Sequence, residues 1–137
     1  MLERATVRLA NAIGYPDPLP EDATRAVFQV DGEEMAVEES GGRLLLRATL
    51  APFGDDPGRA AALAGYAAGR ILREEATLAY DPQDDAIILW QAAPANLPRL
   101  ALRTFFEQFT ASWDWWRARV AEFENPVPSF PEVVIRP

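Results

Sequence analysis

Residues 97–123, LPRLALRTFFEQFTASWDWWRARVAEF, decide the fold of this chain. Their apolar side chains follow one another at spacings of one, three or four residues, which is typical of an amphipathic helix of about seven turns. Pro98 suits the first turn of such a helix. The apolar stripe consists of Leu102, Phe105, Phe106, Phe109, Trp113, Trp116, Val120 and Phe123. A helix with so many aromatic side chains on one side must lie on a broad apolar surface, which a β-sheet can provide.

Three strands of that sheet are predicted upstream of the helix. Residues 25–31, 33–39 and 43–50 alternate between apolar and polar side chains, as half-buried strands do. The dipeptide Asp-Gly at 31–32 and the tripeptide Ser-Gly-Gly at 40–42 separate them and are strong turn signals. We expect an antiparallel meander of three strands.

The remaining elements fall on either side of this meander. A short helix is expected up to Ile13, with Gly14 as its C-terminal cap. A second helix is expected over 59–73, followed by strands over 75–80 and 86–92. The predicted order is helix, three strands, helix, two strands, helix. We therefore expect an α+β fold with a twisted antiparallel sheet flanked by helices, in one domain over 1–123, followed by a proline-rich tail over 124–137.

The composition excludes several kinds of chemistry. The chain has no Cys, no His and no Lys, so thiol nucleophiles, the commonest general base and Schiff-base chemistry are all missing. The acidic pairs, such as Glu33 with Glu34 and Asp84 with Asp85, are neighbours in turns and at strand ends. A catalytic carboxylate pair needs a defined separation across a cleft. We expect no enzyme activity, no metal and no cofactor.

Charge and hydropathy also limit the partners and the location. Thirteen Arg against 21 acidic residues give a net charge of −8, which disfavours nucleic acid. The first fifteen residues are charged and lack a signal-peptide pattern, and no window is apolar enough to span a membrane. We expect a cytoplasmic protein with no membrane association.

Two features point to a further surface that needs cover. The second helix carries Ala61, Gly65 and Gly69 at four-residue intervals, a stripe that lets another backbone approach closely. In the last strand, Ile88 and Trp90 face opposite to Ile87 and Leu89, so both faces are apolar. Each feature fits either a dimer interface or close packing inside one chain.

The order of these elements resembles the class I type III secretion chaperones, the CesT-like or Tir chaperone family of small cytoplasmic bacterial proteins. The resemblance covers about residues 2–123. It rests on AIGY at the end of the first helix, the hairpin FQVDGEEMAVEE, the strand RLLLRATLAPF, the segment TLAYDPQDDAIILWQA and the aromatic helix with FFEQFTASWDWWRARV. The segment GRILREE after the second helix and the proline-rich tail depart from the family pattern.

The resemblance implies a homodimer that meets through the second helix and the late strands, hence through Ala61, Gly65, Gly69, Ile88 and Trp90. It also implies a secreted effector whose N-terminal segment wraps the dimer in extended form and is kept soluble and export-competent. The residues predicted to contact this effector are Val7, Val27, Met35, Val37 and Leu45, of which Met35 and Val37 could equally be core. The alternative is a regulatory or structural interaction module of the same fold without a role in secretion.

Overall fold

The computed structural model describes residues 3–54, 57–70 and 74–124. The elements are α1 (Ala5–Ile13), β1 (Arg25–Val30), β2 (Glu33–Ser40), β3 (Arg43–Pro52), α2 (Pro57–Arg70), β4 (Thr77–Asp81), β5 (Ala86–Pro94) and α3 (Arg99–Glu124). The predicted order and the α+β class are confirmed. Residues 71–73 of the expected second helix and residues 125–137 of the expected tail lie outside the described residues.

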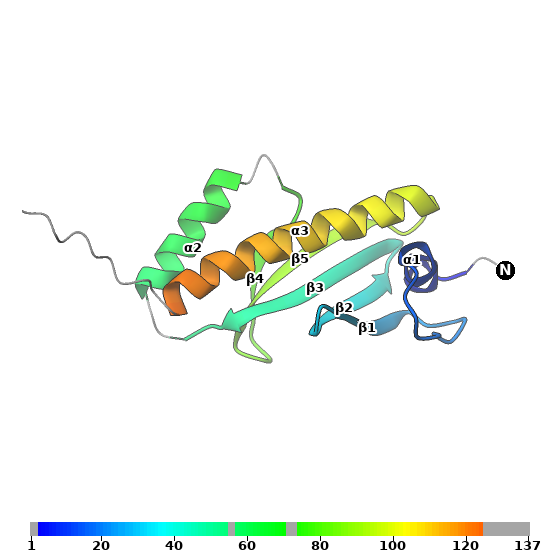
Figure 1. The fold of residues 1–137 in the computed structure, drawn as a ribbon, viewed down its shortest axis with the longest axis horizontal. Helices are drawn as coiled ribbons and strands as arrows, with labels where there is room; N and C mark the ends of the chain where they lie inside the picture. Colours follow the sequence, from blue (N-terminus) through cyan, green and yellow to red (C-terminus); the bar gives the residue numbers. More distant parts are fainter. Residues whose placement is uncertain (1–2, 55–56, 71–73, 125–137) are drawn as a thin grey trace, which may run out of the picture.

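The five strands form one antiparallel sheet in the order β1-β2-β3-β5-β4. The three-strand meander is confirmed, and the chain then passes through α2 and returns to the far edge of the sheet (Figure 1). Both tight turns use positive φ angles: Asp31 and Gly32 lie at 53° and 81°, and Gly41 and Gly42 at 59° and 76°. Two consecutive positive φ angles match the twist of the flanking strands, which fixes the register of each hairpin.

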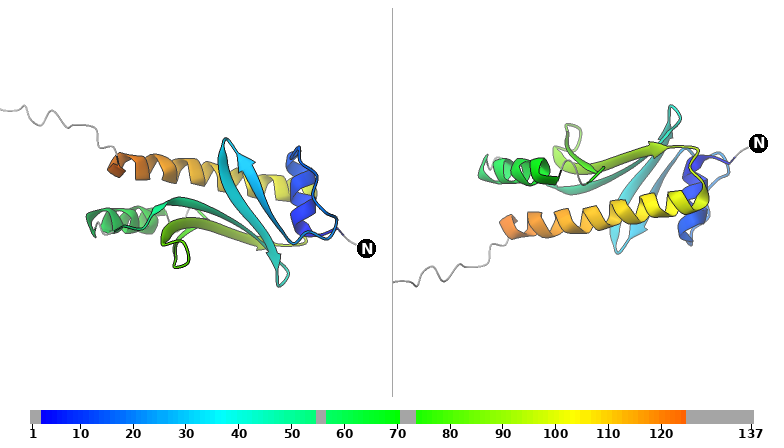
Figure 2. Two further views of the ribbon diagram at one scale, coloured as in Figure 1. Left: turned by 90° about the horizontal axis from the view of Figure 1, so that it is seen from below. Right: turned by 90° about the horizontal axis from the view of Figure 1, so that it is seen from above.

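The core lies between one face of the sheet and the helices α1 and α3. α3 runs along that face, and α1 sits near the beginning of α3 (Figure 2). The buried part of the α3 stripe is Leu102, Phe105, Phe109, Trp113, Trp116 and Val120. Phe106 is half-buried, and the side chain of Phe123 lies outside the described part. Full burial of one such side chain contributes about 1.5–3 kcal/mol, so this stripe determines how α3 docks.

The alternation of the strands assigns their side chains to two faces. Phe28, Met35, Val37, Leu44 and Leu46 point into the core and are at most 1% exposed. The partners across the strands agree with this assignment, since Phe28 lies opposite Met35 and Val37 opposite Leu46. Residues at the intervening positions therefore face away from α1 and α3. We call this second surface the outer face.

Candidate functional site

The outer face of β1, β2 and β3 carries a hollow with a mixed apolar and polar lining. Val27 lies opposite Ala36 on the neighbouring strand, and Ala36 lies opposite Arg47. Leu45 faces the same side, and Val27 is 55% exposed. Together they border a hollow of about 530 Å³, whose lining is Arg25, Ala26, Val27, Ala36, Val37, Glu38, Leu45, Arg47 and Gln83. The exposed valine and the half-buried leucine lie on either side of β2, so each supplies an apolar point of contact within this mixed lining.

Two ion pairs lie at the hollow, one between the neighbouring strands β1 and β2 and one that reaches across β5 from β3 to β4. Arg25 of β1 pairs with Glu38 of β2 at 3.4 Å, and Arg47 of β3 pairs with Asp81 of β4 at 3.8 Å. Asp81 also accepts a hydrogen bond from the backbone N–H of Gln83 at 3.0 Å. Because each charge has an opposite neighbour, the surface does not strongly favour one sign of ligand. Its geometry fits apolar side chains set between charges.

The predicted effector contacts divide into two groups in the structure. Val27 and Leu45 lie together at the hollow, as the alternation of β1 and β3 indicated. Met35 and Val37 are 0% and 1% exposed, so they lie in the core, which is the alternative that the sequence left open for them. Met35 and Val37 share the core face of the sheet with Phe28. The acidic residues that alternate with them in β2 therefore lie at the surface. Val7 of α1 is also buried, at 8% exposure, but it does not belong to the core cluster that includes Ala5, Leu9 and Ala12.

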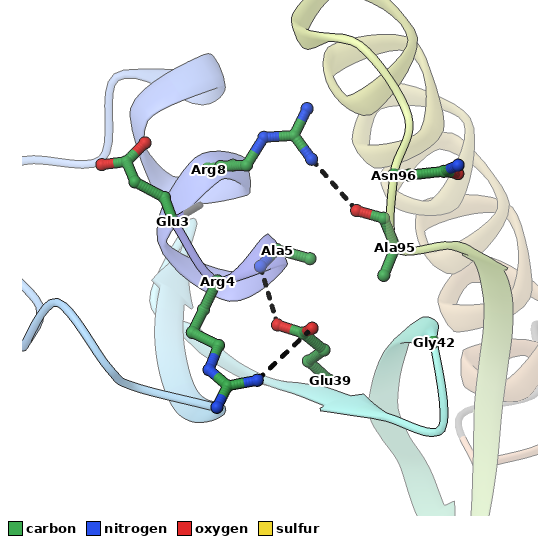
Figure 3. Close-up of a pocket in the computed structure, with 8 residues that line it drawn as sticks. All are labelled: Glu3, Arg4, Ala5, Arg8, Glu39, Gly42, Ala95 and Asn96. Carbon is green, nitrogen blue, oxygen red and sulfur yellow. Dashed lines mark hydrogen bonds and ion pairs between the residues drawn. The ribbon is translucent and has the colours of Figure 1, made fainter. Parts of the chain in front are cut away.

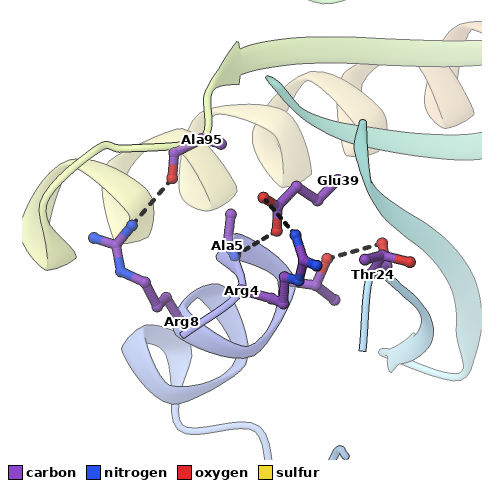
Figure 4. A network of polar contacts seen from close by, with 7 residues as sticks. Arg4, Ala5, Arg8, Thr24, Glu39 and Ala95 are labelled. Carbon is purple, nitrogen blue, oxygen red and sulfur yellow. Dashed lines mark hydrogen bonds and ion pairs between the residues drawn. The ribbon is translucent and has the colours of Figure 1, made fainter. Parts of the chain in front are cut away.

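α1 is held in place by residues that sequence analysis did not single out (Figure 4). Arg4 at its N-cap makes no side-chain cap, and a carboxylate oxygen of Glu39 instead accepts a hydrogen bond from the backbone N–H of Ala5 at 2.7 Å. At the other side of the helix, Arg8 donates to the carbonyl of Ala95 at 3.0 Å and to that of Leu97. A carboxylate at a helix N-terminus satisfies a free donor and interacts favourably with the helix dipole.

These contacts border a second hollow, of about 850 Å³, beside the start of α1 (Figure 3). Its lining is Glu3, Arg4, Ala5, Arg8, Glu39, Gly42, Ala95 and Asn96. These residues come from the start of α1, the β2–β3 hairpin and the loop before α3. Because they are far apart in the sequence, no local motif predicts that they lie together. The charged groups include two carboxylates and two guanidinium groups, and those of Arg8 and Glu39 are already engaged with the chain itself.

α2 is largely uncovered in the single chain. Leu63 is its only buried residue among those described, and Ala61, Gly65 and Gly69 are exposed. Among the described residues, a Cβ atom added at Gly65 or Gly69 would meet nothing within 4 Å beyond its chain neighbours and the nearby backbone of its own helix. The described part of the chain therefore does not use the small-residue stripe for close packing, which argues against the intramolecular alternative.

The two residues of β5 that were assigned with this stripe differ in exposure. Trp90 is 36% exposed on the outer face, opposite Arg47 of β3 and Thr77 of β4. Ile88 is only 8% exposed between the neighbouring strands. A second molecule docked on this face could therefore contact the side chain of Trp90, whereas Ile88 has little accessible surface to offer.

The structure is similar to chains from three solved complexes, the first of which is described as a chaperone–effector complex. It matches a chain of a HopA1–SchA chaperone–effector complex with a TM-score of 0.64 and 18% identity, over 82% of this chain and 89% of that one. A chain of the ExsC–ExsE complex matches with a TM-score of 0.64 and 17% identity, over 83% and 89%. A chain of the ExoT–SpcS complex from Pseudomonas aeruginosa matches with 0.59 and 22% identity, over 80% and 91%. No protein-family model and no curated protein sequence matches the chain.

The fold is that of the class I type III secretion chaperones. The expectation drawn from the order of the sequence elements is thereby confirmed for the fold. In this chaperone fold one of the contacts that hold α2 to the body is made by the aromatic side chain of Trp115. The guanidinium carbon of Arg70 lies 3.8 Å from the ring centre of Trp115, and Tyr66 meets the same indole edge-on at 5.8 Å. Trp115 is thus half-buried between α2 and α3.

Tyr80 of β4 donates a hydrogen bond to the carboxylate of Asp85 at the edge of the sheet. This bond raises the pKa of the exposed Tyr80 hydroxyl above its ordinary value of 10.0. That bond is 2.6 Å long, and Phe53 packs against the same ring at 4.8 Å. In residues 3–54, 57–70 and 74–124, every helix is too short or too polar to span a membrane.

Proposed function

We propose that this chain is a non-catalytic cytoplasmic secretion chaperone that binds the extended N-terminal segment of a secreted effector. The observation that carries the proposal is the uncovered outer face, where Val27 and Leu45 border one hollow between two ion pairs. The chaperone fold supports it, because similar proteins were solved with effectors bound. Binding would keep an aggregation-prone segment soluble and ready for export.

The physical basis of binding is burial of apolar side chains from an unfolded segment. Such a segment loses conformational entropy when it is ordered, so it must cover a large surface. Apolar side chains of the client would occupy the hollow around Val27 and Leu45, and its charged side chains would meet Arg25 and Glu38. Met35, Val37 and Val7 would support this surface from within the core.

We further propose that two copies associate through α2 and the exposed part of β5. Ala61, Gly65 and Gly69 present a surface without bulky side chains, and Trp90 offers a partly exposed indole. A dimer would cover the helix that one chain leaves almost entirely exposed.

Affinity purification from the native host, followed by mass spectrometry and limited proteolysis, tests the chaperone function. The expected result is one dominant partner, an exported protein protected over a short segment near its N-terminus. Leu45→Asp is expected to release this partner, whereas Ala111→Asp, which adds the same charge at an exposed position of α3, is expected to retain it. A partner held through its folded surface would instead favour a regulatory interaction module of the same fold.

A further inference from the structure

A small pocket lies where α2, the start of β4 and α3 meet. Its volume is about 220 Å³, and its walls are mostly apolar. The lining is Ala67, Ala68, Arg70, Glu74, Ala76, Thr77, Leu78 and Trp116. The three alanines leave this space open, because their side chains are too short to fill it. The lining shares no residue with the hollow around Val27 and Leu45 or with the hollow beside α1.

Two buried polar atoms of this lining have no hydrogen-bond partner among the described residues. They are the Oε2 atom of Glu74 and the Nε1 atom of Trp116. The side chain of Glu74 is 8% exposed and Trp116 is 2% exposed, so water reaches little of either. Buried polar atoms are nearly always hydrogen-bonded in native proteins, and leaving one unpaired is costly. One acceptor and one donor are therefore available at the same pocket.

The charges of the lining cancel. Arg70 and Glu74 are its charged residues, and the Nε atom of Arg70 pairs with the Oε1 atom of Glu74. The guanidinium group of Arg70 is also stacked on the ring of Trp115. The carboxylate of Glu74 is thus neutralised through one oxygen, while its second oxygen remains an acceptor. A pocket without net charge favours a neutral guest.

We infer that this pocket binds a neutral primary carboxamide group. Its N–H donates to the Oε2 atom of Glu74, and its carbonyl oxygen accepts from the Nε1–H group of Trp116. A carboxamide presents a donor and an acceptor on two neighbouring atoms. An ammonium group has no acceptor for the indole, and a carboxylate has no donor for Glu74. The hydrocarbon part of the guest would lie against Leu78 and the alanines, as in other small-molecule sites.

A guest in this pocket would connect three elements of the fold. Ala67 belongs to α2, Leu78 to β4 and Trp116 to α3. Since a ligand that binds only the folded arrangement stabilises it, the guest would hold α2 more firmly to the body. Binding therefore has a second readout, slower hydrogen exchange in residues 57–70. The inference does not depend on the proposed function.

The test titrates the full-length, ¹⁵N-labelled protein with benzamide and follows the indole N–H signals of its four tryptophans by NMR. The signal of Trp116 is assigned by its loss in Trp116→Phe. Acetophenone is the matched compound, because a methyl group replaces the amide NH₂ while the ring and the carbonyl remain. We expect benzamide to shift the Trp116 signal to saturation and to slow exchange in residues 57–70. Acetophenone should bind about tenfold more weakly or less, since it lacks the hydrogen bond to a carboxylate.

Two variants test the place of binding. Ala67→Leu fills the pocket from α2 with a residue that suits a helix, and it should weaken benzamide binding about tenfold or more. Ala60→Leu makes the same change at an exposed position of α2 outside the lining and should bind as the native protein does. Equal binding of benzamide and acetophenone, an unmoved Trp116 signal, or full binding by Ala67→Leu would overturn the inference.

The carboxamide can belong to a free small molecule or to an Asn or Gln side chain of a bound protein. The same titration, repeated on the protein with its co-purified partner, distinguishes these sources. A Trp116 signal that is already shifted and no longer responds to benzamide assigns the carboxamide to the partner. An unchanged response assigns it to a free molecule. The first titration needs no client, so failure of the chaperone function would leave its result unaffected.

Discussion

The guanidinium group of Arg70 in α2 lies over the indole ring of Trp115 in α3, with 3.8 Å between its carbon and the ring centre. α2 also buries Leu63 and is joined to the end of β3 by hydrogen bonds from Arg59 to the carbonyls of Pro52 and Phe53. Arg119 approaches the same ring at 5.1 Å, and Arg70 also pairs with Glu74. The position of the small-residue stripe on α2 therefore depends in part on Trp115.

Arg70→Met is expected to loosen α2 while leaving the core intact. Methionine keeps an apolar stem on the ring but loses the cation, which contributes about 0.5–1 kcal/mol at a partly exposed site. Hydrogen exchange should become faster in residues 57–70 and remain unchanged in β3 and β5. Arg103→Met, which removes an exposed Arg paired with Glu107, is the control. Unchanged exchange in α2 would show that the Arg70–Trp115 contact does not hold the helix.

Gly65→Leu is expected to disrupt the proposed dimer without unfolding the chain. Space is open around Gly65 in the single chain, and leucine favours a helix by about 1 kcal/mol relative to glycine. Sedimentation should show a mass near that of one chain for Gly65→Leu and near that of two for the native protein. Ala60→Leu, at an exposed position on another side of α2, should keep the native mass. A native protein that sediments as one chain would remove the dimer proposal.

The fold could be predicted from sequence because local patterns encode it. The spacing in α3 identified the buried stripe from Leu102 to Val120, and Asp31 with Gly32 identified a hairpin turn that the φ angles confirm. The faces of the strands were less certain. Alternation separates Met35 and Val37 from their acidic neighbours, but it does not state which set a helix will cover.

The surfaces of the site depend on contacts between distant segments. Glu39 reaches the N-terminus of α1 from β2, 34 residues away, and no local motif signals this cap. The ladder between β4 and β5 ends at Thr77 opposite Trp90, because β4 begins two residues later than the strand expected at 75. A difference of two residues is usual for predicted strand ends, yet it decides which residues of β5 pair with β4.

Glu39→Ala is expected to destabilise α1. The substitution removes the acceptor of the Ala5 N–H and the ion pair with Arg4, which is 4.0 Å long and largely exposed on the Arg side. Loss of an N-cap acceptor costs about 0.5–2 kcal/mol, so the free energy of unfolding measured in urea should fall by that amount. Glu39→Gln keeps an acceptor oxygen and should lose less. Glu33→Ala, at an exposed position of β2, is the control, and an equal effect of Glu33→Ala and Glu39→Ala would contradict the capping role.

Asp85→Asn is expected to lower the pKa of Tyr80 toward its ordinary value. The Tyr80 hydroxyl donates to the Asp85 carboxylate, and this bond, followed by the small desolvation and the nearby negative charges, raises the pKa of Tyr80 above 10.0. A raised pKa in the folded state means that the contribution of this bond is fully present below pH 10.0 and is lost as the pH rises through the higher folded pKa. The titration is followed by the absorbance of the tyrosinate band. Subtracting the curve of Tyr80→Phe from that of the native protein removes the contributions of Tyr15 and Tyr66. Titration of Tyr80 at the same pH in the native protein and in Asp85→Asn would show that Asp85 does not set the pKa of this hydroxyl.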